Sequence, residues 1–443
     1  MRKQFFSFLI LLSLFVSLSA QKAQPKVQIF DTNLVEQNLR KHVNYLASDK
    51  LEGRRTGEKG ATFSAGYVAN RFANSKLKAG FVKNGKASFL QPFPYKPRNE
   101  KGEILPEAKE AQAYNVIGIL EGTDAVLKNE AIVIGAHYDH LGHGGMGSLA
   151  ANSTEIHFGA DDNASGTSAL IELARTFAQT KANKHTIIFI AFGGEEEGLL
   201  GSKFYVNNPV FPLNKTVAMF NMDMIGRLKD DKLTVGGIGT ANEWNELVKR
   251  KNEIYFDNNN GYGVGKKFDL QLNEDGFGPS DHSSFYGKQI PVLFFFTGTH
   301  LDYHKPSDTA EKINYAGLTK ISSYVSDIVK TIDQNPTKPT YTLAKSSGTG
   351  EGRRGFSVSL GTIPSYSDGN DGLVLDGVRD NSPASKTGLK AGDKIIKLAG
   401  KDIRNVQDYT AVLGEMKPDV EYEVIVMRGS EKLALKITPA TRK

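Results

Sequence analysis

Five short patches between residues 137 and 304 carry histidine or carboxylate side chains, the ligands that divalent metals use when no thiolate is present. The sequence contains no Cys, so any metal would have to be held by nitrogen and oxygen atoms. The candidate ligands are His137, Asp162, Glu195 with Glu196, Asp223 and His304. This combination predicts a metallohydrolase.

The set of candidate ligands favours two ions over one. If one carboxylate bridges, each ion receives one His, one terminal carboxylate and a share of the bridge. Two divalent ions carry about +4 and three carboxylates about −3, and a bridging hydroxide would neutralise the remainder. The other acid of the Glu195-Glu196 pair is then available as a general base. Both side chains reach the site only if the chain turns there, which Gly193, Gly194 and Gly198 permit.

Apolar runs precede three of the patches, in the segments 131–140, 186–198 and 216–226. Such a run is typical of a strand buried on both faces, and an open α/β sheet binds its ligands at strand ends. The runs alternate with helical segments, the last of which covers residues 318–328. We therefore expect an α/β domain with a mixed, mostly parallel central sheet and helices on both faces.

The residues around the candidate ligands form five motifs within residues 33–333. In chain order they are His137-Tyr138-Asp139, the segment GADDNASG at 159–166, Glu195-Glu196 with Gly198-Leu199, Asn221-Met222-Asp223-Met224, and Tyr303-His304 followed by Asp308-Thr309. The set resembles the co-catalytic two-zinc aminopeptidase family, which includes bacterial leucyl aminopeptidases, extracellular carboxypeptidases and glutaminyl cyclases. The resemblance implies a zinc exopeptidase fold and two Zn²⁺ ions per chain, although Mn or Co would fit the same ligands.

The resemblance also implies a role for each site residue. One zinc would be held by His137 and Asp223 and the other by Glu196 and His304, with Asp162 as the bridge; Glu195 would be the general base, Asp139 would orient His137, and Tyr303 would donate to the oxyanion or pack beside the site. Asp161 is the alternative bridge, because spacing alone does not separate it from Asp162. Members of this family also tend to have a cis peptide bond after the bridging Asp.

Other polar residues near the motifs carry weaker signals. His140, His143 and His157 lie in a Gly-rich segment, and we interpret them mainly as surface histidines of a loop, with substrate contact as the alternative. Glu197 is interpreted as solvated. Ser280-Asp281-His282 resembles a segment that borders the site in this family, and an N-cap or a hydrogen-bonded turn is the alternative explanation for Asp281.

The N-terminus predicts export. Arg2 and Lys3 precede an apolar stretch at residues 5–18 that ends in small residues, which is the layout of a secretory signal peptide over residues 1–20. A membrane span is the alternative, but the stretch falls short of the about 20 residues that a bilayer requires. Loss of Arg2 and Lys3 would lower the net charge from +6 to +4, and the remaining charges alternate in sign, which argues against nucleic-acid binding. We expect a periplasmic or extracellular protein without a stable membrane span.

The composition changes near the C-terminal end. Residues 335–354 are rich in Pro, Thr, Ser and Gly and predict a linker between a metallopeptidase domain, 21–334, and a small, mainly β module, 355–443. This module resembles a PDZ domain. Its segment Leu360-Gly361-Thr362-Ile363 corresponds to the loop with which such domains receive a peptide carboxylate, while a strand edge pairs with the peptide. The alternative is that the module only packs against the catalytic domain.

The main functional hypothesis is an exported zinc-dependent aminopeptidase. Glu195 would deprotonate a water held between the metals, and this water would attack the scissile carbonyl of a peptide substrate. The alternative within the same family is a carboxypeptidase, a dipeptidase or a glutaminyl cyclase. The alternative of another class is a non-catalytic binding or receptor-like protein, since some relatives of this fold have lost their ligands.

Overall fold

The computed structural model of the chain describes residues 32–97, 109–145, 147–150, 153–255, 266–344, 358–364, 372–378, 382–404 and 406–441. The predicted signal peptide, residues 1–20, lies outside these ranges, as do residues 345–354 of the predicted linker. Within the described ranges, none of the helices combines the length and the apolar character that crossing a bilayer would require.

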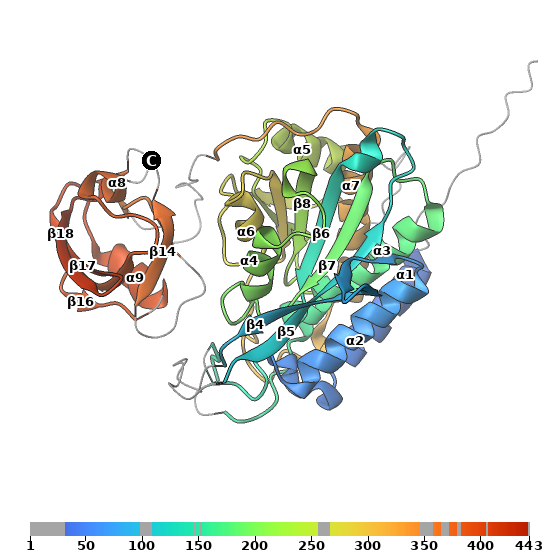
Figure 1. Cartoon of the computed structure of the whole chain (residues 1–443), viewed down its shortest axis with the longest axis horizontal. Helices are drawn as coiled ribbons and strands as arrows, with labels where there is room; N and C mark the ends of the chain where they lie inside the picture. The colour runs from blue at the N-terminus through green and yellow to red at the C-terminus, as the bar shows by residue number, and fades with distance from the viewer. Residues whose placement is uncertain are drawn as a thin grey trace, which may run out of the picture.

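A nine-stranded sheet forms the centre of the larger domain, which we call the sheet domain (Figure 1). Its strands lie in the order β1-β5-β7-β6-β8-β11-β9-β10, and β4 pairs with β5. Their bounds are β1 Lys78–Ala79, β4 Leu90–Tyr95, β5 Ala111–Leu120, β6 Ala131–His137, β7 Thr186–Phe192, β8 Thr216–Met222, β9 Lys232–Gly236, β10 Asp269–Leu272 and β11 Val292–Phe296. The central strands β7, β6, β8 and β11 are parallel, whereas β5 and β9 pair antiparallel with β7 and β11. The expected mixed sheet is confirmed.

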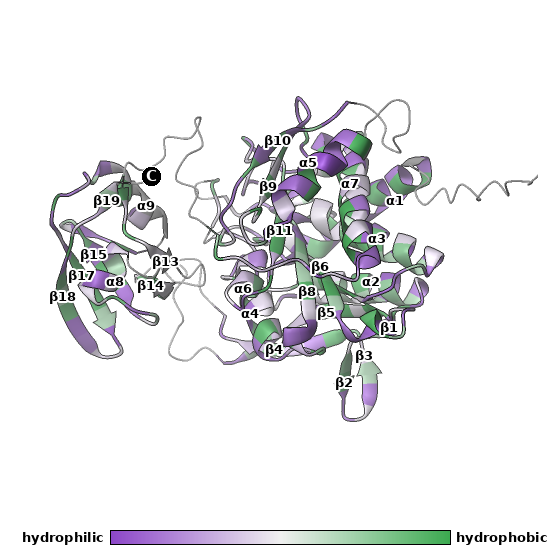
Figure 2. Cartoon of the chain, turned by 90° about the horizontal axis from the view of Figure 1, so that it is seen from above, coloured by the Kyte–Doolittle hydropathy of each residue, from purple (hydrophilic) through white to green (hydrophobic). Residues whose placement is uncertain are grey.

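Helices cover both faces of this sheet (Figure 1). One face carries α1 (Thr32–Leu46), α2 (Lys59–Asn74), α3 (Gly166–Thr180) and α7 (Tyr315–Gln334), with α5 (Trp244–Tyr255) against α7; the other carries α4 (Leu200–Asn207) and α6 (His282–Tyr286). Successive side chains of a strand point to opposite faces, so Ile132 and Ile134 of β6 join the larger hydrophobic cluster and Val133 joins the smaller one. Figure 2 shows apolar residues along the central strands and hydrophilic residues on the outward sides of the helices.

The C-terminal module has its own sheet and hydrophobic core. Six strands pair in the order β13-β14-β15-β17-β18, with β16 beside β15, and β12 pairs with β19. The elements are β12 Val358–Ser359, β13 Thr362–Pro364, β14 Leu373–Val378, α8 Pro383–Thr387, β15 Lys394–Leu398, β16 Lys401–Asp402, α9 Val406–Glu415, β17 Tyr422–Arg428, β18 Glu431–Ile437 and β19 Ala440–Thr441. Alternate residues of β14 and β17, such as Leu373 with Leu375 and Val424 with Val426, are buried. The expected mainly β module is therefore present.

The sheet domain also contains a separate two-stranded hairpin, in which β2 (Phe81–Lys83) pairs with β3 (Lys86–Ser88).

The first residues of the predicted linker lie along the sheet domain. The backbone N–H of Thr342 donates to the carbonyl of Thr240 at 2.9 Å, and the backbone N–H of Ala344 donates to the hydroxyl of Tyr286 at 2.8 Å. The described part of the segment from residue 335 onward is thus hydrogen-bonded to the domain that it follows.

A buried arginine joins three parts of the sheet domain. Arg54 is 0% exposed, and its guanidinium donates to the backbone carbonyls of Tyr138 at 2.8 Å, Phe158 at 2.8 Å and Gly159 at 2.9 Å, and also to that of Leu46. Burial lowers the pKa of Arg54 to about 10, which still leaves the group protonated at neutral pH. The guanidinium therefore fixes the end of α1 and the chain after β6 relative to the loop before α3.

Replacing Arg54 should destabilise the sheet domain strongly. We expect Arg54→Met to lower the free energy of unfolding by about 3 kcal/mol or more, because buried carbonyls lose a charged donor. Urea unfolding followed by the fluorescence of Trp244, the only Trp of the chain, measures this change. The matched control is Arg250→Ala on the exposed side of α5, which should change the stability by less than about 0.5 kcal/mol. Equal stability of the two variants would contradict the assigned role of Arg54.

Candidate metal centre

The candidate ligands meet at one edge of the sheet because their strands are parallel. His137 is the last residue of β6, Asp223 directly follows β8, and Glu195 and Glu196 lie in the loop after β7. His304 lies in the loop after β11. The carboxyl ends of parallel strands point the same way, so four loops deliver side chains to the same place. The fifth side chain comes from the helical turn at Ala160–Ser165, directly before α3.

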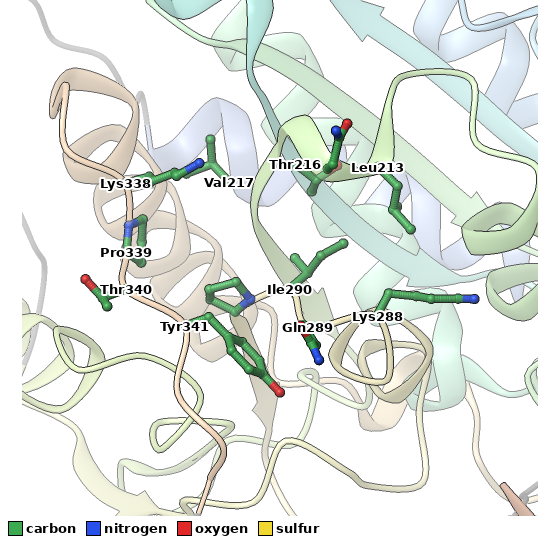
Figure 3. A pocket seen from close by; sticks show the side chains of 12 residues that line it. Leu213, Thr216, Val217, Lys288, Gln289, Ile290, Lys338, Pro339, Thr340 and Tyr341 are labelled. Atoms are coloured by element: carbon green, nitrogen blue, oxygen red, sulfur yellow. The ribbon is translucent and has the colours of Figure 1, made fainter. Parts of the chain in front are cut away.

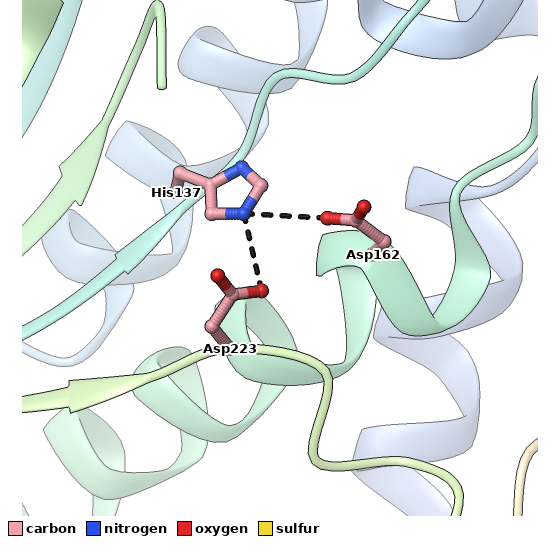
Figure 4. A group of neighbouring side chains, drawn as sticks. All are labelled: His137, Asp162 and Asp223. Carbon is pink, nitrogen blue, oxygen red and sulfur yellow. Dashed lines mark hydrogen bonds and ion pairs between the residues drawn. The ribbon is translucent and has the colours of Figure 1, made fainter. Parts of the chain in front are cut away.

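His137 forms the first group of facing side chains with Asp162 and Asp223 (Figure 4). Its Nε2 atom lies 3.2 Å from Asp223 Oδ1 and 3.4 Å from Asp162 Oδ1. Its Nδ1 atom lies 3.3 Å from the backbone carbonyl oxygen of Asp139. A proton on Nδ1 donated to this carbonyl leaves Nε2 available as a ligand.

His304 forms the second group from the other side of Asp162. Its Nε2 atom lies 3.0 Å from Asp162 Oδ2 and 3.4 Å from Glu196 Oε2. Its Nδ1 atom donates to the carbonyl of Gly147 at 2.7 Å, which again leaves Nε2 available. The two oxygens of Asp162 thus face different histidines.

The distances within both groups fit a zinc ion. Ligand atoms that surround a tetrahedral zinc at about 2.0 Å lie about 3.3 Å from one another. The four nitrogen–oxygen distances in the two groups range from 3.0 to 3.4 Å. The donor set therefore fits two cations that share the Asp162 carboxylate.

Asp161 points to a different place than Asp162. Its Oδ1 atom accepts the backbone N–H of Gly226 at 2.6 Å, and its Oδ2 atom lies 3.1 Å from His300 Nε2. The buried carboxylate of Asp308 accepts the backbone N–H groups of both aspartates, at 2.8 and 3.1 Å. The peptide bond between Asp162 and Asn163 is cis, as the family resemblance led us to expect.

The carboxylate of Asp139 holds the turn that presents the two glutamates. It accepts the backbone N–H of Glu195 at 3.1 Å and that of Glu196 at 3.4 Å, together with the hydroxyl of Thr56 at 2.7 Å. Its distance from His137 Nδ1 is longer, 3.8 Å. Gly194 has φ +72° in this turn, a conformation that L side chains rarely adopt. The carboxylate of Asp139 therefore contacts the Glu-Glu turn more closely than it contacts His137.

The charges of the site shift the pKa values of its members in opposite directions. Burial opposes the charged form of His137, but the carboxylates of Asp223 and Glu195 raise its pKa well above the ordinary value. Burial also opposes ionisation of Asp162, yet the facing imidazoles lower its pKa well below the ordinary value. The pKa of His304 rises to about 9 against the effect of burial, because of the neighbouring carboxylates. The site therefore stabilises positive charge, as a cation site must.

Two further side chains of the motifs lie beside the ligands. The ring of Tyr303 stacks on that of His304 with 3.8 Å between centroids, and burial together with the site carboxylates raises the pKa of its phenol. Asp281 is 0% exposed and occupies the N-cap position of α6, but its side chain makes no capping hydrogen bond. Its backbone carbonyl accepts the N–H of Ser284 at 3.2 Å, so the expected hydrogen-bonded turn is present and the expected side-chain cap is not. Burial raises the pKa of Asp281 to about 7, and the charges of nearby Asp139 and Asp223 add to this effect.

Several residues were misjudged from the sequence. His140 and His157 are buried, at 1% and 0% exposure, so the interpretation as surface histidines is wrong for both. Glu197 is also buried, at 8% exposure, and lies 3.6 Å from the guanidinium of Arg55 rather than in solvent. Arg54 gave no signal in the sequence, because its role depends on carbonyl groups that are distant along the chain.

A large cavity of the sheet domain lies away from the candidate metal ligands. A cavity of about 640 Å³ lies between the amino ends of β8 and β11 and the segment 338–341 (Figure 3). Thr216, Ile290 and Tyr341 are among its lining residues. The candidate metal ligands lie instead at the carboxyl ends of the parallel strands.

The fold and the candidate metal ligands indicate a metallopeptidase-like α/β protein. Comparison with known proteins identifies the family that each domain matches. Residues 115–329 match the model of peptidase family M28, and residues 358–438 match that of the PDZ domain. The central part of the sheet domain thus matches peptidase family M28, and the chain carries a PDZ domain at its C-terminal end. The family resemblance and the PDZ resemblance are both confirmed.

Curated relatives are similar over part of their length. The chain is 30% identical over 294 residues to Aminopeptidase YwaD of Bacillus subtilis, a match that covers 59% of this chain and 58% of that protein. It is 32% identical over 211 residues to Leupeptin-inactivating enzyme 1 of Streptomyces exfoliatus, which covers 46% of this chain and 39% of the relative. The chain therefore spans well under two thirds of the length of these relatives.

Solved structures share the fold at low identity. An aminopeptidase from Aneurinibacillus sp. strain AM-1 superposes with a TM-score of 0.50 and 19% identity, over 72% of this chain and 98% of that one. A glutaminyl cyclase from Bacteroides thetaiotaomicron gives a TM-score of 0.51 and 18% identity, over 66% of this chain and 97% of that one. These structures share the α/β fold of the sheet domain.

The shared position of Asp162 generates a prediction about metal content. Asp162→Asn should weaken the binding of both zinc ions, because one carboxylate faces both groups of ligands. The affinity should fall by more than about 10–100-fold, which is the effect of losing a hydrogen-bond partner of a metal ligand. Elemental analysis after dialysis against a buffered zinc concentration measures the loss. Asp161→Asn is the matched control and should keep its metal, since Asp161 faces Gly226 and His300. Full zinc content in Asp162→Asn would rule out the bridging role.

Proposed function

We propose that this chain is an exported, zinc-dependent aminopeptidase that removes residues from the free amino termini of peptides. The main support for the proposal is the position of the Asp162 carboxylate between two groups of His and carboxylate side chains. Glu195 lies beside the first of these groups. The match of residues 115–329 to peptidase family M28 and the similarity to Aminopeptidase YwaD support the same reaction class.

His137 and Asp223 would hold one ion, Glu196 and His304 the other, and Asp162 both. Divalent ions bound there supply Lewis-acid polarisation of the scissile carbonyl and acidify the attacking water. Zinc is the metal we propose, since imidazole and carboxylate ligands at these separations suit it.

Glu195 is suited to move the proton. Its Oε2 atom lies 3.9 Å from His137 Nε2, farther than the ligand oxygens of Asp162 and Asp223, so its carboxylate stays free of the first group. Burial and the neighbouring carboxylates raise its pKa well above the ordinary value despite the imidazole of His137. Glu195 would accept a proton from the attacking water and then donate it to the leaving amine as the C–N bond breaks.

Tyr303 is the proposed donor to the tetrahedral oxyanion. Burial and the surrounding carboxylates keep its phenol protonated by raising its pKa, so the O–H remains a donor across the physiological range. The stacked ring of His304 restricts the orientation of the phenol.

The PDZ domain is proposed to bind a peptide or protein C-terminus at the segment Leu360-Gly361-Thr362-Ile363. Leu360 is 2% exposed, Gly361 has φ +74°, and the hydroxyl of Thr362 lies 2.6 Å from that of Tyr409 on α9. These features support a fixed loop at the edge of β13, next to which a peptide strand can pair. We retain the division into a metallopeptidase domain, 21–334, a linker, 335–354, and this domain, 355–443, as part of the proposal.

Glutaminyl cyclase activity is the second candidate, since a cyclase shares the fold. The distinguishing experiment compares peptides with free and with acetylated amino termini, and adds a peptide that begins with glutamine. We expect zinc-loaded enzyme to cleave only the free peptides at their first bond. Cleavage from the carboxyl end, cyclisation without cleavage, or no reaction with any peptide would each reject the aminopeptidase proposal; the last would favour a binding protein.

The general base can be tested separately from metal binding. Glu195→Gln should lower kcat by about 10²–10⁴-fold, because it removes proton transfer, and should leave the zinc content unchanged. The matched control is Glu197→Gln, whose side chain pairs with Arg55 and which should keep most of the activity. Retained turnover in Glu195→Gln would assign the base to another residue.

A further inference from the structure

His140 occupies a position in the metal centre that the proposed mechanism does not use. Its side chain is 0% exposed, and its Nδ1 atom lies 2.7 Å from Glu196 Oε1. Its backbone N–H donates to the carbonyl of Arg54 at 3.2 Å. A Cβ atom at Gly159, which has φ +55°, would lie 2.5 Å from two atoms of the imidazole ring. Arg54 and Gly159 therefore leave this ring little freedom to move.

The imidazole could serve Glu196 either as a hydrogen-bond donor or as a fellow ligand. A fellow ligand on the same tetrahedral zinc would lie about 3.3 Å from each ligand oxygen. The Nδ1 atom of His140 instead lies 2.7 Å from Glu196 Oε1 and 3.9 Å from Asp162 Oδ2. The first distance is that of a charge-assisted hydrogen bond and is shorter than the separation of two ligand atoms on one tetrahedral zinc. We therefore favour the hydrogen bond, although His140 also lies within reach of an ion that Asp162 and Glu196 would hold.

The two oxygens of Glu196 have different partners. Oε1 faces His140 at 2.7 Å, and Oε2 faces His304 at 3.4 Å. Among the described residues, the Nε2 atom of His140 has no hydrogen-bond partner. With the proton on Nδ1, the unpartnered atom is an acceptor rather than an N–H donor, which is the less costly arrangement.

We propose that His140 is a positioning residue that donates its Nδ1–H to Glu196 Oε1 and so presents only Oε2 to the second zinc ion. This inference rests on the proposed two-metal function. The hydrogen bond would act on Glu196, which would hold the second ion, whereas among the described residues no hydrogen bond or ion pair joins His140 to His137 or Asp223, which would hold the first. Loss of this hydrogen bond should therefore weaken one ion and leave the other bound.

The test measures zinc affinity in the full-length chain by competition with a chromophoric chelator. We expect His140→Ala to weaken one of two ions by about 10–100-fold and to leave the other unchanged. His140→Asn places an amide N–H near the position of Nδ1, so it should restore most of the affinity. His143→Ala is the matched control. The imidazole of His143 is exposed, its Nδ1 atom lies 3.0 Å from the carbonyl oxygen of Thr154, and its loss should have no effect on zinc affinity. His140→Phe, which keeps a ring without a donor, replaces the Ala variant if that variant does not fold.

Each outcome decides between the possibilities. Wild-type affinity for both ions in His140→Ala or His140→Phe would overturn the proposal. Equal loss in His140→Asn and His140→Ala would also overturn it, because an amide nitrogen does not replace a ligand and the result would make His140 a direct ligand. Fewer than two ions in the wild-type chain would instead reject the proposed two-metal function, whatever the variants do.

Discussion

The concentration of negative charge at one edge of the sheet constrains the rest of the sheet domain. Asp139, Asp162 and Asp223 are 0%, 4% and 8% exposed, and the side chains of Glu195 and Glu196 are 10% and 9% exposed. Carboxylates so close together repel one another, and burial removes the water that would screen them. The fold must therefore supply positive charge and hydrogen-bond donors around them.

Much of that compensation comes from the backbone and from one buried cation. Asp139 accepts two backbone N–H groups of the Glu-Glu turn, and Asp308 accepts those of Asp161 and Asp162. Arg54 binds carbonyls on both sides of the centre and adds its charge. The histidines supply the remaining favourable contacts, and the raised pKa values of His137 and His304 reflect how strongly the site attracts cations.

Local sequence patterns were sufficient to predict the strands that carry candidate ligands. Apolar runs that end in His or Asp predicted β6 and β8, and parallel pairing then brought His137 and Asp223 together. The same rules could not identify Arg54 or His140, since their partners are carbonyls and a carboxylate brought close only by the tertiary fold. Glu197 was misjudged for a related reason: its burial depends on Arg55, more than a hundred residues earlier in the chain. The expectations from the sequence thus differ from the structure mainly for side chains that support the candidate ligands, and not for the candidate ligands themselves.

We propose that the carboxylate of Asp162 joins two metal ions, and the other proposed roles depend on this bridge. The most direct test is anomalous diffraction at the zinc edge from crystals of the full chain grown with zinc. We expect two peaks about 3.5–4 Å apart, each about 2 Å from a different oxygen of Asp162, one beside His137 and one beside His304. A single peak, or a second peak that does not contact Asp162, would contradict it.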